Sequence, residues 1–439
     1  MKLKTTVIIG SLILIAGGCT QNPLHTQLED YMDAHALVNN FSGTVLVTRN
    51  DSILLKKAYG YADYEWKVKN TIDTKFSLAS VSKQFTAAAI LQLAERKKLS
   101  LDDRLSKYYP DFPKGHLITI KMLLTHNSGV SDDVEEIFFS NRSIKQDSVI
   151  NYIMQRPFAF EPNAQTAYSN TGYYLLAMII EKVSGQSYST YLNEQVFKKA
   201  NMTNSGVSSN ETIIKKLAKA YHHKEGKLIK NPYTNWERNI GMDGVYATIE
   251  DLYRWNKNLF DSATVLTEAS KRQMFTSYNE HNFGYGVLVN PFYNHGRDLI
   301  GHDGGFYGTQ TSFNKFREDD VFVGILSNNE SPSYLLAYGL SAIAFGIPVE
   351  LPYEHKEVPI DREIFSEYVG NYEGIKIHQK GDRLLYSEHD IELIPESESK
   401  FFRADDNNRT IEFIRNEEGE VYQIIVVKAG VKEIKKKTG

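Results

Sequence analysis

Two groups of β-type runs lie far apart in the chain and enclose a long segment with a helical pattern. The first group, residues 41–48 and 53–62, surrounds an Asn-Asp turn and predicts an antiparallel hairpin. The second group lies within residues 283–329, and residues 101–205 predict mostly helices with loops. Strands at both ends with helices between them indicate an α+β domain whose antiparallel sheet is completed late in the chain. We assign this domain, with its flanking helices and mostly helical insertion, to residues 41–350.

Helical segments are predicted both inside and outside this insertion. They cover residues 24–37, 83–97, 170–185 and 334–344. The second of them is rich in Ala and Leu, which favour helices, and its Phe85, Ala89 and Leu93 form one apolar stripe.

A change in composition marks the end of this domain. Residues 348–360 contain three prolines among charged residues, which is typical of a linker. Short β-type runs with polar turns follow, so residues 358–439 predict a separate all-β module, either a small barrel or a sandwich. Of the two, we expect the barrel-like form.

The first residues have the pattern of an export signal. Residues 1–18 contain a charged start, a short apolar run and a small-residue cleavage zone, so we predict a signal peptide there. Residues 16–19, Ala-Gly-Gly-Cys, resemble a bacterial lipobox, which implies cleavage before Cys19 and lipidation of its sulfur. Residues 19–40 would then form a lipidated N-terminus and first helix of a membrane-anchored protein of the bacterial envelope. The alternative is a plain signal peptide, with Cys19, the chain's single cysteine, incidental.

The overall charge argues against one class of partner. Nucleic-acid-binding domains are usually strongly basic, whereas this chain has a formal net charge of -4. We therefore expect no nucleic-acid partner, and we interpret the cluster of Lys432, Lys435, Lys436 and Lys437 as a solvated tail.

Ser80 and Lys83 form a candidate nucleophile and base. Residues three apart share a helix face, so the Lys83 amine can reach the Ser80 hydroxyl. Burial disfavours the charged form of a lysine and lets it take the serine proton. The Ser80 backbone N–H is also a candidate oxyanion donor. A second Ser-x-x-Lys spacing, Ser397 to Lys400, lies in a polar stretch beyond the linker and is less suited to this role.

Tyr168 and Asn170 form a second candidate element. A tyrosine near a lysine can have a lowered pKa and pass protons to a leaving group. Asn170 can donate to a substrate carbonyl and orient Lys83. The alternative is a loop tyrosine followed by an asparagine N-cap.

The glycine-rich residues 300–305 form a third candidate element. An exposed strand edge there could pair with a substrate and offer an N–H group to an oxyanion, while His302 supplies a positive or hydrogen-bonding group. The alternative is a glycine-rich turn with a surface histidine.

In this order the three elements resemble the serine β-lactamase and penicillin-binding-protein superfamily, most closely the relatives of the class C enzymes. Those relatives include D-alanyl-D-alanine carboxypeptidases, D-amino-acid peptidases and family VIII esterases. Residues 123–129, 241–252 and 283–287 also match, and residues 367–373 resemble a small β-barrel domain appended to many relatives. The resemblance implies a β-lactamase/transpeptidase-like fold. It also implies roles in catalysis for Ser80, Lys83 and Tyr168, and in substrate binding for Asn170, His302, Gly304 and Gly305.

One departure shifts the expected substrate. Class C β-lactamases have Lys-Thr-Gly at the third motif, where this chain has His302, Asp303 and Gly304. The literal Lys-Thr-Gly at residues 437–439 lies beyond the linker and cannot take this role. Histidine at this motif is common in the peptidase and esterase relatives.

These observations predict a serine hydrolase that forms an acyl-enzyme on Ser80 with a D-amino-acid peptide or a carboxylic ester. The substrate is a small molecule or peptide, including peptidoglycan fragments. A β-lactamase and a non-catalytic penicillin-binding or peptidoglycan-binding envelope protein are the alternatives. We expect no cofactor and no metal, since the chain has no His-Glu-x-x-His motif and its paired His222 and His223 lack a third ligand in sequence.

The lipidation hypothesis can be tested by Cys19→Ser. We expect the variant to be soluble or uncleaved, because the thioether acceptor is gone. Fractionation and the mass of the processed N-terminus are the measurements. Wild-type processing and membrane association of the variant would contradict the hypothesis.

Overall fold

The computed structural model describes residues 23–132, 146–225, 227–231, 235–236 and 239–438. The predicted signal peptide and Cys19 lie outside these residues. Within the described chain, no helix is both long and apolar enough to cross a membrane.

A six-stranded antiparallel sheet forms the centre of the first domain, in the order β10-β11-β12-β13-β1-β2. Its strands are β1 (Gly43–Arg49), β2 (Ser52–Tyr59), β10 (Leu288–Val289), β11 (Leu299–Phe306), β12 (Thr309–Phe316) and β13 (Val321–Ser327). The first hairpin pairs with the late strands as predicted: Val45 of β1 lies opposite Ile325 of β13. The chain therefore completes its sheet only after the helical insertion, which confirms the α+β fold.

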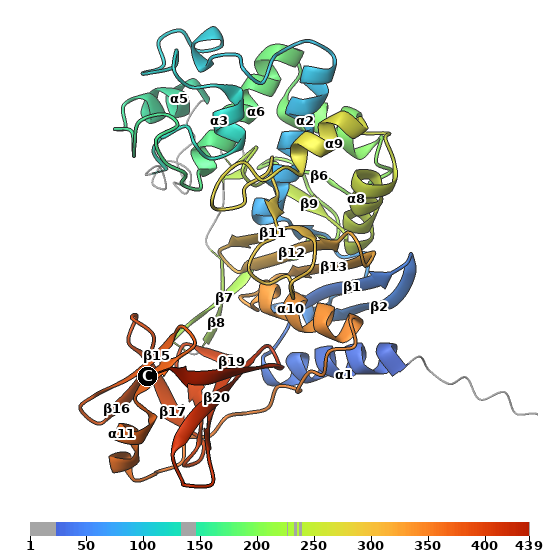
Figure 1. Ribbon diagram of the computed structural model, residues 1–439. Helices are drawn as coiled ribbons and strands as arrows, with labels where there is room; N and C mark the ends of the chain where they lie inside the picture. Colours follow the sequence, from blue (N-terminus) through green and yellow to red (C-terminus); the bar gives the residue numbers. More distant parts are fainter. Residues whose placement is uncertain (1–22, 133–145, 226, 232–234, 237–238, 439) are drawn as a thin grey trace, which may run out of the picture.

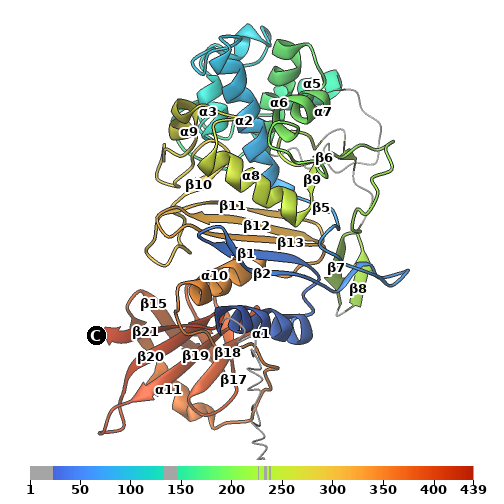
Figure 2. The same ribbon diagram turned by 90° about the vertical axis from the view of Figure 1, so that its right-hand side faces the viewer.

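Helices cover both faces of this sheet (Figures 1 and 2). On one face lie α1 (Pro23–Val38) and α10 (Ser333–Ala344), whose apolar side chains share a buried cluster with β1, β2 and β13. On the other face lie the short 3-10 helix η1 (Ala79–Ser82) and α8 (Ile249–Asp261). Both faces are thus excluded from water, as the apolar strands require.

The segment between β2 and β10 contributes a helical lobe above the sheet in Figure 1. Its helices are α2 (Lys83–Glu95), α3 (Ile120–Leu124), α5 (Gln146–Met154), α6 (Asn170–Ser184), α7 (Tyr188–Leu192) and α9 (Glu268–Met274). Further 3-10 or π turns are η2 (Leu105–Lys107) and η3 (Asn193–Phe197). Small sheets pair β3 (Tyr61–Asp63) with β4 (Val68–Lys69), β9 (Val245–Ala247) with β5 (Phe76–Ser77) and β6 (Gly206–Val207), and β7 (Tyr221–Lys224) with β8 (Lys227–Lys230).

The C-terminal module is a closed eight-stranded barrel, which decides between the two predicted forms. It follows η5 (Arg362–Ile364) and α11 (Phe365–Tyr368). Its strands are β14 (Gly370–Tyr372), β15 (Ile375–Lys380), β16 (Arg383–Tyr386), β17 (Ile391–Pro395), β18 (Lys400–Arg403), β19 (Asp406–Arg415), β20 (Val421–Lys428) and β21 (Val431–Thr438). Pairing of β14 with β21 closes the barrel, so it has no free strand edge.

The third motif forms a strand, and the interpretation of residues 300–305 as a turn is wrong. These residues lie within β11, which pairs with β12 along its whole length, from Leu299↔Phe316 to Phe306↔Thr309. On its other side β11 pairs with β10 only at Ile300 and Gly301. Residues 302–306 therefore have a strand edge that does not pair with β10. This agrees with the interpretation of the motif as a strand edge that is open to a substrate.

A close contact joins α1, α10 and the barrel. The Tyr31 hydroxyl on α1 donates to the carbonyl oxygen of Ala429, in the β20–β21 turn, over 3.2 Å. The Tyr31 hydroxyl lies next to Gly339 of α10. A Cβ added at Gly339 would overlap this hydroxyl and lie 2.9 Å from the Ala429 oxygen. Figure 2 shows α1 between the sheet and the barrel. The missing side chain at Gly339 therefore allows the three elements to meet.

We expect Gly339→Ala to destabilise the protein by about 1–3 kcal/mol, the usual cost of overpacking a buried site. Gly172→Ala is the matched control, because Gly172 is also helical and an added Cβ would have its nearest neighbours at 3.5 Å. There the helix propensity of alanine should be neutral or stabilising by up to about 1 kcal/mol. Denaturant unfolding measures both variants, and equal midpoints would contradict the role of Gly339.

Candidate active site

Ser80 lies on η1, which is pressed against the sheet beneath the helical lobe. A Cβ at Gly304 of β11 would lie 2.5 Å from the Leu78 carbonyl oxygen, so only glycine permits this approach. The Thr311 hydroxyl donates to the same oxygen over 2.8 Å. Ala79, directly before Ser80, has a φ of 46°, a left-handed conformation that disfavours a residue with a side chain. The sheet therefore holds the serine on a strained, tightly fixed turn.

Lys83 begins α2 and is completely buried. Its Nζ donates to Ser80 Oγ over 3.0 Å, to Asn170 Oδ1 over 2.8 Å and to the Met242 carbonyl oxygen over 2.9 Å. Burial lowers the Lys83 pKa to about 7, against the opposing effect of the Asp243 and Asp132 carboxylates. Lys83 can therefore be neutral or charged near neutral pH, as a general base requires.

Tyr168 lies beside this pair, with its ring centroid 4.8 Å from Lys83 Nζ. Its pKa is raised above the usual tyrosine value, because burial outweighs the hydrogen bond to Ser80. The expectation of a lowered pKa is thus wrong. Because 37% of the residue remains exposed, solvent limits the size of the rise. The hydroxyl keeps its proton at neutral pH and is a donor rather than a phenolate base.

His126 fixes the position of the tyrosine ring. The two rings stack with centroids 4.7 Å apart, and His126 Nδ1 accepts from the Ser169 N–H over 2.9 Å. His126 belongs to the matching stretch 123–129, but nothing in its sequence context indicated a stacking role.

Asn170 is the first residue of α6, whose N-cap is the preceding Ser169. The interpretation of Asn170 as the N-cap is therefore wrong by one residue. Its Oδ1 accepts from Lys83, and its Nδ2 donates to Asp132 Oδ2 over 3.2 Å. Asp132 also accepts from the N–H and hydroxyl of Thr171, so one carboxylate orders the helix start and the amide that holds the lysine. Sequence reasoning missed Asp132, which lies 38 residues from Asn170.

His302 is buried rather than at the surface, with 6% of its area exposed. Its Nδ1 lies 2.6 Å from the Asp303 carbonyl oxygen, which assigns the Nδ1–H tautomer. Burial, together with the Lys83 charge, lowers its pKa to about 4. His302 is therefore neutral near pH 7 and offers hydrogen bonding without a fixed positive charge.

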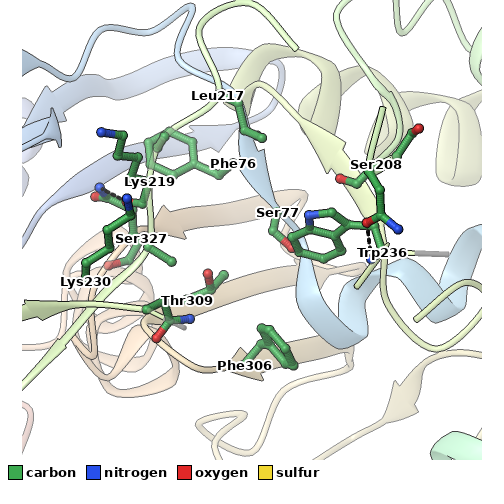
Figure 3. Close-up of a pocket in the computed structure, with 16 residues that line it drawn as sticks. Phe76, Ser77, Ser208, Leu217, Lys219, Lys230, Trp236, Phe306, Thr309 and Ser327 are labelled. Atoms are coloured by element: carbon green, nitrogen blue, oxygen red, sulfur yellow. Dashed lines mark hydrogen bonds between the residues drawn. The ribbon is translucent and has the colours of Figure 1, made fainter. Parts of the chain in front are cut away.

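A cavity of about 430 Å³ opens at Ser80. It is lined by Ser80, Asn170, Asn239, Met242, Asp243, Gly305, Phe306, Tyr307, Gly308, Gln310 and Glu330. A neighbouring cavity of about 610 Å³ shares Phe306 with it and has aromatic walls formed by Phe76 and Trp236 (Figure 3). Together they offer room for groups on either side of a scissile bond.

The remaining candidate residues lie elsewhere. Ser397 and Lys400 are at the β17–β18 turn, and Lys437 and Thr438 belong to β21, all within the barrel. Across the described ranges, no group of three or more His, Cys, Asp or Glu side chains is arranged to hold a metal ion.

Comparisons with known proteins agree with this geometry. Penicillin-binding protein 4* of Bacillus subtilis (strain 168) is 29% identical over 415 residues, covering 86% of this chain and 90% of that protein. The crystal structure of a penicillin-binding protein from Bacillus halodurans has a TM-score of 0.64 at 28% identity, covering 75% of this chain and 100% of that one.

A D-amino acid amidase from Ochrobactrum anthropi SV3 has the same fold, with a TM-score of 0.63 at 23% identity over 74% of this chain and 97% of that one. The family model described as Beta-lactamase matches residues 29–343, well over half of the sequence. The chain belongs to the Beta-lactamase family.

Proposed function

We propose that the protein is a serine hydrolase that forms an acyl-enzyme on Ser80 with an amide or an ester, a D-amino-acid peptide or carboxylic ester being its substrate. The observation that carries this proposal is the buried Lys83 amine, 3.0 Å from Ser80 Oγ, with its pKa lowered to about 7. An amine that loses its proton near neutral pH can accept the proton of a serine hydroxyl.

The proposed reaction follows from the positions of these groups. Neutral Lys83 accepts the Ser80 proton as Oγ attacks the substrate carbonyl. The backbone N–H groups of Ser80 and Gly305 stabilise the oxyanion. Tyr168, protonated at neutral pH, donates to the leaving nitrogen or oxygen and regains a proton from Lys83. Water then enters and hydrolyses the acyl ester, and the proton returns to Ser80.

The third motif supports a peptidase or esterase over a β-lactamase. A lysine at this motif would supply a cation for the carboxylate of a β-lactam, whereas His302 is neutral near pH 7. Penicillin binding without efficient turnover agrees with the names of the relatives from both Bacillus species. Those names also support a place in the cell envelope, where peptidoglycan fragments would be available as substrates.

Ser80→Ala should abolish covalent labelling by a fluorophosphonate or fluorescent penicillin probe, because the attacking oxygen is absent. In-gel fluorescence of the purified protein measures this, with circular dichroism as the check on folding. Equal labelling of the variant and the wild type would contradict the assignment of Ser80 as the nucleophile. A screen with p-nitrophenyl esters, nitrocefin and D-amino-acid amides separates the enzyme from a binding protein, since a folded protein that turns over none of them would be non-catalytic.

The pH profile tests Lys83. The neutral fraction of Lys83 grows as pH rises through about 7, so kcat/KM should rise through this range and fall away below about pH 6. Lys83→Arg should lower kcat/KM by about 10²–10⁴-fold, because arginine stays protonated. Lys98→Arg, at an exposed position, is the control and should match the wild type. A flat profile between pH 5 and 9 would count against Lys83 as the base.

A further inference from the structure

A large cavity lies where the first domain meets the barrel. Its volume is about 730 Å³, and we call it the interdomain cavity. The first domain contributes residues 38–40, at the end of α1, and residues 329–332, between β13 and α10. The barrel contributes residues 403–406 and 408–409, around the β18–β19 turn, and Figure 2 shows these two strands next to α1. Both domains are therefore needed to form this cavity.

The interdomain cavity meets the cavity at Ser80 at one residue, Glu330, which lines both. The Glu330 side chain is 45% exposed, and its Oε2 accepts from the His223 N–H over 2.9 Å. His223 itself also lines the interdomain cavity. A ligand that extends past Glu330 can therefore occupy both cavities at once, and the barrel can contact a substrate whose reacting bond lies at Ser80.

The charged side chains of the barrel wall are paired with one another. Arg403 donates to both carboxylate oxygens of Asp405, over 2.9 and 2.6 Å. Arg409 Nε forms an ion pair with Asp406 at 2.9 Å. These pairs leave little net charge on the wall, so its field does not favour a strongly charged ligand.

The same wall keeps polar groups that solvent can reach. Asn40 is exposed, and Asn39 and Asn408 are partly exposed. The Asp405 side chain is 48% exposed and that of Arg409 is 20% exposed. An amide has both donors and an acceptor, a guanidinium has only donors and a carboxylate has only acceptors. The cavity thus offers accessible donors and acceptors close together.

We propose that the interdomain cavity binds a neutral saccharide carried by the substrate, whose scissile amide or ester bond lies at Ser80. Each sugar hydroxyl both donates and accepts, which matches a wall that offers both kinds of partner. The apolar C–H faces of a sugar ring can pack on the ring of Tyr334, which lines the same cavity. This proposal rests on the proposed hydrolase function and adds a second region of contact with its substrate.

The walls of the interdomain cavity favour a saccharide over a peptide. A peptide that binds through its backbone usually adds a strand to an exposed sheet edge. The barrel strands pair with one another in a closed sheet, and the residues 38–40 and 329–332 lie at helix ends and in a connecting segment. Recognition here must therefore come mainly from side chains, as the hydroxyls of a sugar require.

Calorimetry of the purified full chain tests the site, with chitotetraose, a neutral tetramer of N-acetylglucosamine, and tetraalanine as probes. We expect the wild type to bind chitotetraose with a Kd of about 1 mM or lower, and tetraalanine at least about tenfold more weakly. Ala404→Trp should weaken chitotetraose binding at least about tenfold, because the indole fills the cavity from an exposed turn position. Glu388→Trp, at an exposed position in the β16–β17 turn, is the matched control and should bind like the wild type.

Arg409→Gln keeps the test valid if Ala404→Trp does not fold, as judged by circular dichroism. It should weaken chitotetraose binding about threefold or more, because a donor at the wall is lost. Absence of chitotetraose binding in the wild type, or equal affinities in the wild type and both cavity variants, would overturn the proposal. Tighter binding of tetraalanine than of chitotetraose would assign the cavity to a peptide and overturn it as well.

A linked ligand tests whether the saccharide belongs to the substrate. In Ser80→Ala, which cannot turn it over, we expect a disaccharide–pentapeptide from peptidoglycan to bind at least about tenfold more tightly than the pentapeptide alone, because the two parts bind as one molecule. Ala404→Trp in the same background should remove this gain. Equal affinities for the linked ligand and the pentapeptide would contradict the proposal.

Fluorophosphonate labelling of Ser80 separates this proposal from the proposed function. A wild type that is labelled but does not bind chitotetraose overturns the saccharide site and leaves the hydrolase intact. A wild type that binds chitotetraose, loses this binding in Ala404→Trp and is not labelled supports the saccharide site and contradicts the hydrolase.

Discussion

The burial of a single amine, Lys83 Nζ, determines how the rest of the site is arranged. Removing an ammonium from water is costly unless acceptors replace the lost hydration, and here η1, α6 and the loop before β9 each supply one. Three parts of the chain that are distant in sequence must therefore meet at one atom. The same burial lowers the pKa of Lys83. When Lys83 is protonated, its charge also lowers the pKa of His302 and helps to keep that side chain neutral.

Close backbone contacts hold this amine in place. Gly304 lets β11 approach the turn before Ser80, and a Cβ at Gly286 would lie 2.5 Å from the carbonyl oxygen of Lys83 itself. Gly241, with a φ of 83°, lies against the Tyr173 carbonyl on α6. These glycines therefore let packed elements approach each other closely, and the contacts fix the positions of the side chains that we propose to be catalytic.

The parts of this structure that depend on local sequence could be predicted. The β1–β2 hairpin follows from its turn residues, α2 and α6 from their apolar spacing, and the Ser80–Lys83 pair from one helical turn. What could not be predicted depends on long-range packing. The Asp132 link to Asn170 and the Met242 carbonyl both arise from loops that approach α6 and α2 only in the folded chain. The neutral state of His302 and the high pKa of Tyr168 required the burial of each group to be known.

The places of the cavity-lining residues in the fold affect which substitutions the protein can tolerate during evolution. Two of the residues proposed to move protons, Ser80 and Lys83, lie on η1 and α2, and the third, Tyr168, is stacked on His126 just before α6. Asn239, Tyr307 and Glu330, by contrast, belong to connecting segments at the rim of the cavity. Substitutions in connecting segments are tolerated better than substitutions in packed elements. Descendants of such a gene can therefore acquire new substrates while the reaction stays the same.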